Sequence, residues 1–144
     1  MILPDVNVLV HAYRRESPSH PRYAAWLSAL VSGADEVALV HGTLTGFLRI
    51  VTNRRIYPDA APTPEALAFV EVMRRSRRGR WLAAGEAVWT SFSALVAGDS
   101  QVRGNLVPDA WLAALALSHG CRLATADRGF ARFEGLDWFD PARQ

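Results

Sequence analysis

Three aspartates in this sequence are candidates for metal chemistry: Asp5, Asp109 and Asp127. Carboxylates that converge repel one another unless a cation lies between them, and Mg²⁺ and Mn²⁺ prefer oxygen ligands. One or two such ions can activate a water molecule and hold a phosphodiester for in-line displacement. Each aspartate also has a structural explanation. Asp5 and Asp109 could stabilise helix N-termini, and Asp127, in the segment DRG, could belong to a turn.

Two neutral polar residues and one cation accompany these acids. Asn7 lies two residues after Asp5, and Thr125 lies two residues before Asp127. Both could orient a ligand, a water molecule or a neighbouring carboxylate, or they could be an ordinary capping residue and strand residue. Arg128 directly follows Asp127 and could reach a phosphate.

The elements that must position these residues alternate between short apolar runs and helical patterns. The apolar runs predict strands at residues 2–4, 36–40, 81–85, 122–127 and 136–139. Apolar spacing and end signals predict helices over residues 6–14, 20–33, 42–53, 63–76, 86–98 and 108–120. Thr63 is the expected cap of its helix, and a proline opens the last one. Strand–helix alternation predicts a single three-layer α/β/α domain over residues 1–144, with a short, mainly parallel central sheet.

This architecture bears on whether the aspartates are structural residues or metal ligands. In such sheets the ligand lies beyond the carboxyl ends of the strands. Asp5 follows the first predicted strand and Asp127 ends the fourth, while Asp109 opens the helix that leads into the fourth. All three are therefore expected on one rim of the sheet, which favours a shared metal site over three separate caps.

Composition bounds the class of protein. Charged residues make up 21% of the chain, the formal net charge is +2 and the pI is about 9.2. Every basic residue apart from histidine is arginine, which suits contact with phosphate but could equally reflect a GC-rich genome. The single cysteine, Cys121, is expected to be a small buried hydrophobe. No signal peptide or membrane span is recognisable, so we expect a cytoplasmic protein.

Other site types find little support. The four histidines lack zinc-ligand spacing, and no dinucleotide-binding, P-loop or GxSxG motif occurs. The segment RRSRRGR (74–80) is the one dense basic run, and Trp81 beside it could stack on a base. Arg77 and Arg78 in this run could contact RNA or a protein partner, or they could be solvated surface residues.

Two segments at opposite ends of the chain resemble one family. These are LPDVNVLVHAY near the start and NLVPDAWLAALALSHGCRLATADRGFARF near the end. Together with their separation, they resemble PIN-domain ribonucleases, most closely the VapC toxins of bacterial type II toxin–antitoxin systems. The resemblance covers essentially the whole chain, and its most specific part is residues 105–133.

The resemblance implies an endoribonuclease that depends on Mg²⁺ or Mn²⁺ and uses Asp5, Asp109 and Asp127 as its acidic residues. It also implies a VapB-like antitoxin partner and a homodimer or a higher toxin–antitoxin assembly. One family feature is missing: the glutamate usually found after the second strand corresponds to Gly46, and no acid occurs from Val37 to Ile56. This departure favours one well-held ion over two.

Two alternatives remain open at this point. Without that glutamate, the chain could be a PIN-like module that binds RNA or a partner without cutting. It could also be a metal-dependent phosphatase built on a similar sheet. Cleavage of RNA with Mn²⁺ that is lost in EDTA separates the first alternative from a nuclease, and activity on a small phosphomonoester but not on RNA identifies the second.

Overall fold

The computed structural model describes residues 1–143 and contains one sheet in which every pair of neighbouring strands is parallel. The strands are β1 (Ile2–Pro4), β2 (Val37–Leu39), β3 (Gly79–Trp81), β4 (Arg122–Ala124) and β5 (Trp138–Phe139). Their order across the sheet is β3-β2-β1-β4-β5. The expected α/β class with a short parallel sheet is confirmed.

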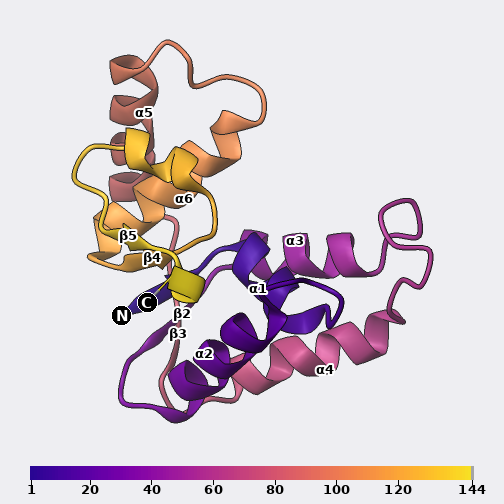
Figure 1. Ribbon diagram of the computed structural model, residues 1–144. Helices are drawn as coiled ribbons and strands as arrows, with labels where there is room; N and C mark the ends of the chain where they lie inside the picture. Colours follow the sequence, from indigo (N-terminus) through magenta and orange to yellow (C-terminus); the bar gives the residue numbers. More distant parts are fainter. Residues whose placement is uncertain (144) are drawn as a thin grey trace.

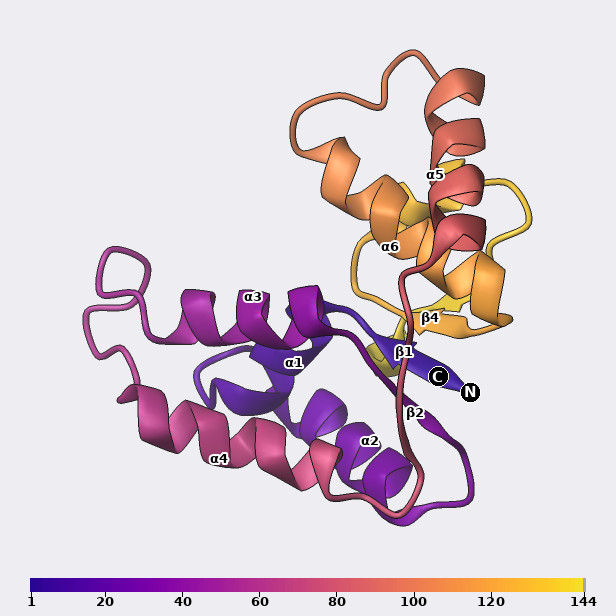
Figure 2. The same cartoon turned by 180° about the vertical axis from the view of Figure 1, so that it is seen from behind.

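Helices cover both faces of this sheet. They are α1 (Val6–Tyr13), α2 (His20–Ser32), α3 (His41–Val51), α4 (Thr63–Arg74), α5 (Glu86–Gly98) and α6 (Leu106–His119), with 3₁₀ turns η1 (Arg128–Arg132) and η2 (Pro141–Arg143). Helices α1 to α4 gather on one side of the strands, and α5 and α6 lie on the other (Figures 1 and 2). No helix within residues 1–143 is long and apolar enough to cross a membrane.

Alternation along the strands divides the core between the two faces. Ile2 packs with the cluster formed by α1 to α4, whereas its neighbour Leu3 packs with α6 and η1. In β2, Leu39 joins the first cluster and Ala38 joins the second. Successive side chains of a strand point to opposite faces, so a strand covered on both sides must be apolar throughout. The uninterrupted apolar strands β1 and β2 follow from that requirement.

The direction of winding reverses at β1. From β1 the chain crosses to β2 and then to β3, and it later returns past β1 to β4 and β5. The crevice at the carboxyl ends of β1 and β4 is therefore a topological switch point, the usual place for a ligand in such sheets. Asp5 and Thr125 directly follow these two strands.

Several assignments differ from the sequence prediction. Strand β4 ends at Ala124 and not at Asp127, because its register with β1 and β5 ends there, and β5 begins at Trp138 and not at Leu136. The third strand is Gly79–Trp81 rather than 81–85, because these residues pair with β2 and the chain then leaves the sheet toward α5. At Gly79 a Cβ atom would lie 3.0 Å from the Met73 carbonyl oxygen, so glycine permits this close approach. The residue that caps α4 is Pro62 and not Thr63, and α6 begins at Leu106, two residues before Pro108.

Candidate active site

Asp5 lies at the centre of the switch point, between β1 and α1. Its backbone N–H donates to the Ala124 carbonyl of β4, which fixes its position beside that strand. Its side chain is buried, and Oδ1 accepts a hydrogen bond of 2.6 Å from the Val6 N–H. Asp5 therefore caps α1, as the structural interpretation predicted. Its second oxygen, Oδ2, is held separately.

Thr125 and Asn7 hold that second oxygen. The Thr125 hydroxyl and the Asn7 amide both donate to Asp5 Oδ2 at 2.7 Å. Asn7 also accepts from the Ala126 N–H at 3.0 Å, and Thr125 accepts from the Asp127 N–H at 3.1 Å. The two polar residues singled out in the sequence thus lie against the first aspartate and tie it to the backbone that carries Asp127.

The three aspartates share one electrostatic environment. Burial raises the pKa of Asp5, and the nearby Asp127 charge raises it further, against the lowering effect of the Thr125, Val6 and Asn7 hydrogen bonds. Burial also raises the pKa of Asp109, and the charges of Asp5 and Asp127 both contribute. The structure therefore brings Asp5, Asp109 and Asp127 within electrostatic reach of one another, and their mutual repulsion favours a bound cation.

A cleft of about 340 Å³ opens beside these acids, between α3 and α6. Asp5 and Asp109 line it together with Gly46, the position predicted from the sequence to match the family glutamate. Arg49 lies on the same wall as Gly46, and the sequence reasoning missed it. The signal was available, because Gly42, Gly46 and Arg49 are spaced i, i+4 and i+7 and so share one face of a helix.

Comparison with known proteins identifies the family. The PIN domain family model matches residues 2–136. Ribonuclease VapC43 of Mycobacterium tuberculosis (strain ATCC 25618 / H37Rv) is 38% identical over 141 residues, which cover 98% of this chain and 95% of that protein. The chain belongs to the PIN-domain family. The resemblance seen in the sequence is confirmed over nearly its full length, in the VapC branch of the PIN domains.

Solved PIN-type structures share the fold at lower identity. VapBC2 from Rickettsia felis, bound to a DNA fragment from its promoter, gives a TM-score of 0.69 at 17% identity and covers 97% of this chain and 98% of that one. FitAcB from Neisseria gonorrhoeae gives 0.68 at 22% identity and covers both chains completely. These likenesses support the α/β/α architecture.

The donor set of this PIN domain fits a hard divalent cation, and metal dependence is a property of the VapC ribonucleases. The three carboxylates are oxygen donors of the kind that such ions prefer, and Thr125, whose buried hydroxyl is engaged by Asp5, Asn7 and the Asp127 N–H, orients Asp5. Within residues 1–143, no three His, Cys, Asp or Glu side chains are gathered closely enough to enclose an ion as they stand. The carboxylates are electrostatically coupled across a more open site.

The basic run lies elsewhere on the domain. Arg77 and Arg78 are exposed in the turn before β3, at the amino end of the strands and thus at the opposite edge of the sheet from Asp5. Trp81, at the carboxyl end of β3, stacks on His41 with ring centroids 4.3 Å apart. Arg77 and Arg78 thus precede β3, and Trp81 ends it. Arg128, by contrast, is exposed next to Asp127.

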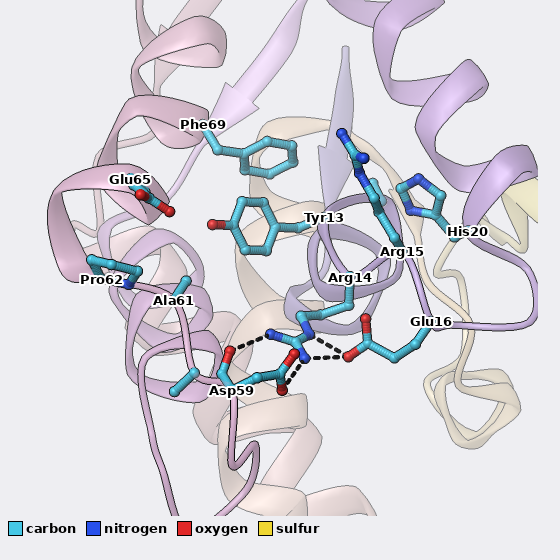
Figure 3. Close-up of a pocket in the computed structure, with 12 residues that line it drawn as sticks. Tyr13, Arg14, Arg15, Glu16, His20, Asp59, Ala61, Pro62, Glu65 and Phe69 are labelled. Atoms are coloured by element: carbon cyan, nitrogen blue, oxygen red, sulfur yellow. Dashed lines mark hydrogen bonds and ion pairs between the residues drawn. The ribbon is translucent and has the colours of Figure 1, made fainter.

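A second, larger cavity, of about 660 Å³, lies at the far end of α1 and is lined by none of the three aspartates (Figure 3). There the buried Arg14 binds the carboxylates of Glu16 and Asp59, and its guanidinium also lies 4.1 Å from the centre of the Tyr57 ring. The hydrogen bond from Arg14 lowers the pKa of Asp59. Both acids are thus occupied by Arg14, which fixes the loop between α3 and α4 against α1.

Proposed function

We propose that this protein is the toxin of a type II toxin–antitoxin pair and acts as a metal-dependent endoribonuclease through Asp5, Asp109 and Asp127. The observation that carries this proposal is the electrostatic coupling of three carboxylates at the switch point of a PIN-domain sheet. The relatives named as ribonucleases support the same activity. We also propose that a single PIN domain extends over residues 1–144.

The residues divide the work as follows. Asp5 has little freedom, because Val6, Asn7 and Thr125 donate to its two oxygens, so it is a fixed ligand. Asp109 and Asp127 are held from separate elements and complete the ligand set around a Mg²⁺ or Mn²⁺ ion. When bound, such an ion activates the attacking water and offsets the charge of the phosphodiester. No histidine base is then required, and none of His11, His20, His41 or His119 lines the cleft.

Gly46 bears on the number of ions. It lines the cleft that Asp5 and Asp109 share and offers no side-chain ligand there. We therefore propose one well-held ion. The same feature favours the second candidate function, a PIN-like module that binds RNA or a partner without cutting it.

A VapB-like antitoxin is the proposed protein partner. The structural neighbours from Rickettsia felis and Neisseria gonorrhoeae were solved as VapBC2 and FitAcB. A homodimer, or a larger toxin–antitoxin assembly, remains a proposal.

The purified protein should cleave an RNA pool in Mg²⁺ or Mn²⁺, and EDTA should abolish cleavage. Asp109→Asn and Asp127→Asn are the controls for a contaminating nuclease, and each should lower the rate by at least about a hundredfold. RNA that binds but stays intact at every metal concentration would establish the binding module instead.

A further inference from the structure

One wall of the active-site cleft carries a cation that has no acidic partner. Arg49 projects from α3, is exposed and lines the cleft together with Asp5 and Asp109. Within residues 1–143, no carboxylate lies within ion-pair distance of its guanidinium, whereas Arg14, Arg122 and Arg132 each have at least one. An arginine stays charged at every physiological pH and matches phosphate with paired donors.

Arg49 is also not the counter-ion of the acidic cluster. Among the described residues, its guanidinium makes no ion pair with Asp5, Asp109 or Asp127, and the nearby cation Arg132 is itself held by Asp99 at 3.0 Å and by Gln101 at 3.0 Å. The Arg49 charge therefore remains available to an anion that enters from solvent.

Two glycines leave room for that anion. Gly42 and Gly46 line the same wall of the cleft as Arg49. A Cβ at Gly42 would meet no heavy atom within 4 Å, and one at Gly46 would meet only Val6 Cγ2, at 3.3 Å. Nothing in the packing thus requires glycine at Gly42, and the absence of side chains at both positions keeps the cleft open between Asp5 and Arg49.

The opposite wall adds an aromatic surface. Trp111 of α6 lines the cleft and is only partly buried. A cation on one side and an aromatic ring on the other are the two elements that bind single-stranded nucleic acids, through phosphate contact and base stacking. The combination favours a nucleotide strand over a small inorganic anion.

From these contacts we propose that the α3–α6 cleft seats the RNA strand beside the cleaved bond and that Arg49 binds a phosphate neighbouring the one attacked. Arg49 is eight residues beyond the start of α3, which is about 12 Å along the helix axis. It is therefore a positioning residue for the strand and not a ligand at the reacting phosphorus. This inference rests on the proposed ribonuclease function.

The test compares Arg49→Gln with Arg54→Gln. Arg54 is also exposed and makes no ion pair within the described residues, but it does not line the cleft, so the two variants lose the same charge at different places. Binding of a fluorescent single-stranded RNA is measured in EDTA, where no cleavage occurs, over a range of salt concentrations. Arg49→Gln should weaken binding about tenfold and lower the salt slope by about 0.7, the value for one phosphate contact on a single strand.

Arg49→Lys should keep the wild-type salt slope and recover part of the affinity, which a purely structural role would not produce. In Mn²⁺, Arg49→Gln should lower kcat/KM by about tenfold, and Arg54→Gln should leave it unchanged. Equal losses in both glutamine variants, or wild-type binding by Arg49→Gln, would overturn the assignment while the ribonuclease function stands. A wild-type protein that neither binds nor cuts RNA would overturn both.

Discussion

At the scale of single residues, Asp5 is a helix cap and a candidate ligand at the same time. Its Oδ1 caps α1, and its Oδ2 takes donors from Asn7 and Thr125. Substitution by asparagine would preserve the cap but turn an amide NH₂ toward the Asn7 amide, which is itself a donor. Asp5→Asn should therefore lower cleavage by orders of magnitude without stabilising the metal-free protein. Cleavage assays in Mn²⁺ and thermal melts in EDTA measure the two effects.

Asp109→Asn offers the cleaner measure of repulsion in the cluster. The Asp109 side chain makes no hydrogen bond within residues 1–143, and the charges of Asp5 and Asp127 raise its pKa after burial does. Neutralising it should stabilise the metal-free protein by up to about 1 kcal/mol, which is about 2–4 °C in Tm for a chain of this size. Thermal melts in EDTA measure this change in stability, and RNA cleavage in Mn²⁺ measures the activity of the variant. A lower Tm with full activity would return Asp109 to a structural role.

The raised pKa values of Asp5 and Asp109 predict how stability depends on pH. A carboxyl group whose pKa is higher in the folded state binds protons more tightly there, so unfolding becomes easier as the pH rises from 3.8 through the raised pKa. Asp59 and Asp99, whose pKa values are lowered, act in the opposite sense and at more acidic pH.

In EDTA, the Tm of the wild type should therefore fall as the pH is raised above about 4 toward neutrality, and Asp109→Asn should flatten that fall. Saturating Mn²⁺ should remove most of it, because the ion stabilises the ionised form. Identical slopes for the wild type and Asp109→Asn would show that folding does not raise the pKa of Asp109.

At the scale of elements, helix α3 carries positions that bear on both the proposed ion and the proposed substrate contact. Gly46 lies on its cleft-facing side, where a Cβ atom would approach only Val6 Cγ2, at 3.3 Å. Gly46→Glu should tighten Mn²⁺ binding, because an added anionic oxygen strengthens a hard-cation site. Gly46→Gln is the matched control, since both variants share the gain in helix propensity of up to about 1 kcal/mol. Equal Mn²⁺ affinities for the two variants in titration calorimetry would place the missing acid elsewhere.

The limits of an element were predicted correctly where the pattern lay within the segment, and incorrectly where pairing between strands sets those limits. Helix α5 spans residues 86–98, as predicted, because its apolar spacing and the glycines at its two ends are local features of the sequence. The third strand was placed two residues late, because its limits are set by pairing with Val37–Leu39, which no local pattern reports.

The same distinction between local patterns and tertiary contacts applies to the candidate site. Asp5, Asn7, Thr125 and Asp127 could be assembled from the sequence, because each adjoins the carboxyl end of a strand and parallel strands bring those ends together. Contact of Arg77 and Arg78 with RNA or a protein partner stays a prediction: both are exposed, and they precede β3 whereas Trp81 ends it. Arg49 was missed because its helical spacing from Gly42 and Gly46 shows a shared helix face but does not show that this face borders Asp5.

At the scale of the whole molecule, the two helical layers meet over one acidic rim. Asp109 belongs to α6, whereas Arg49 and Gly46 belong to α3, and these two helices lie on opposite sides of the strands (Figure 2). Only Asp5 and Asp127 are placed there by the strand ends themselves. Ligand binding at the rim therefore joins the two layers, and metal should raise the Tm of the whole domain as its concentration rises above the Kd.

The same rim predicts how a partner silences the toxin. A protein inhibitor that places an arginine or lysine among Asp5, Asp109 and Asp127 would offset the repulsion between these carboxylates, which otherwise favours metal binding. In a complex with such an inhibitor, the toxin should bind Mn²⁺ at least about tenfold more weakly than the free toxin does, the effect of about 1.4 kcal/mol of competition.

The control for this competition is the Asp109→Asn toxin in the same complex. Its cluster carries one negative charge less, so the partner should also bind it more weakly than the wild type. Titration calorimetry with Mn²⁺ and a competition assay for the partner measure the two affinities. A complex that keeps the full Mn²⁺ affinity of the free toxin would show that the partner inhibits by covering the α3–α6 cleft and not by replacing the ion.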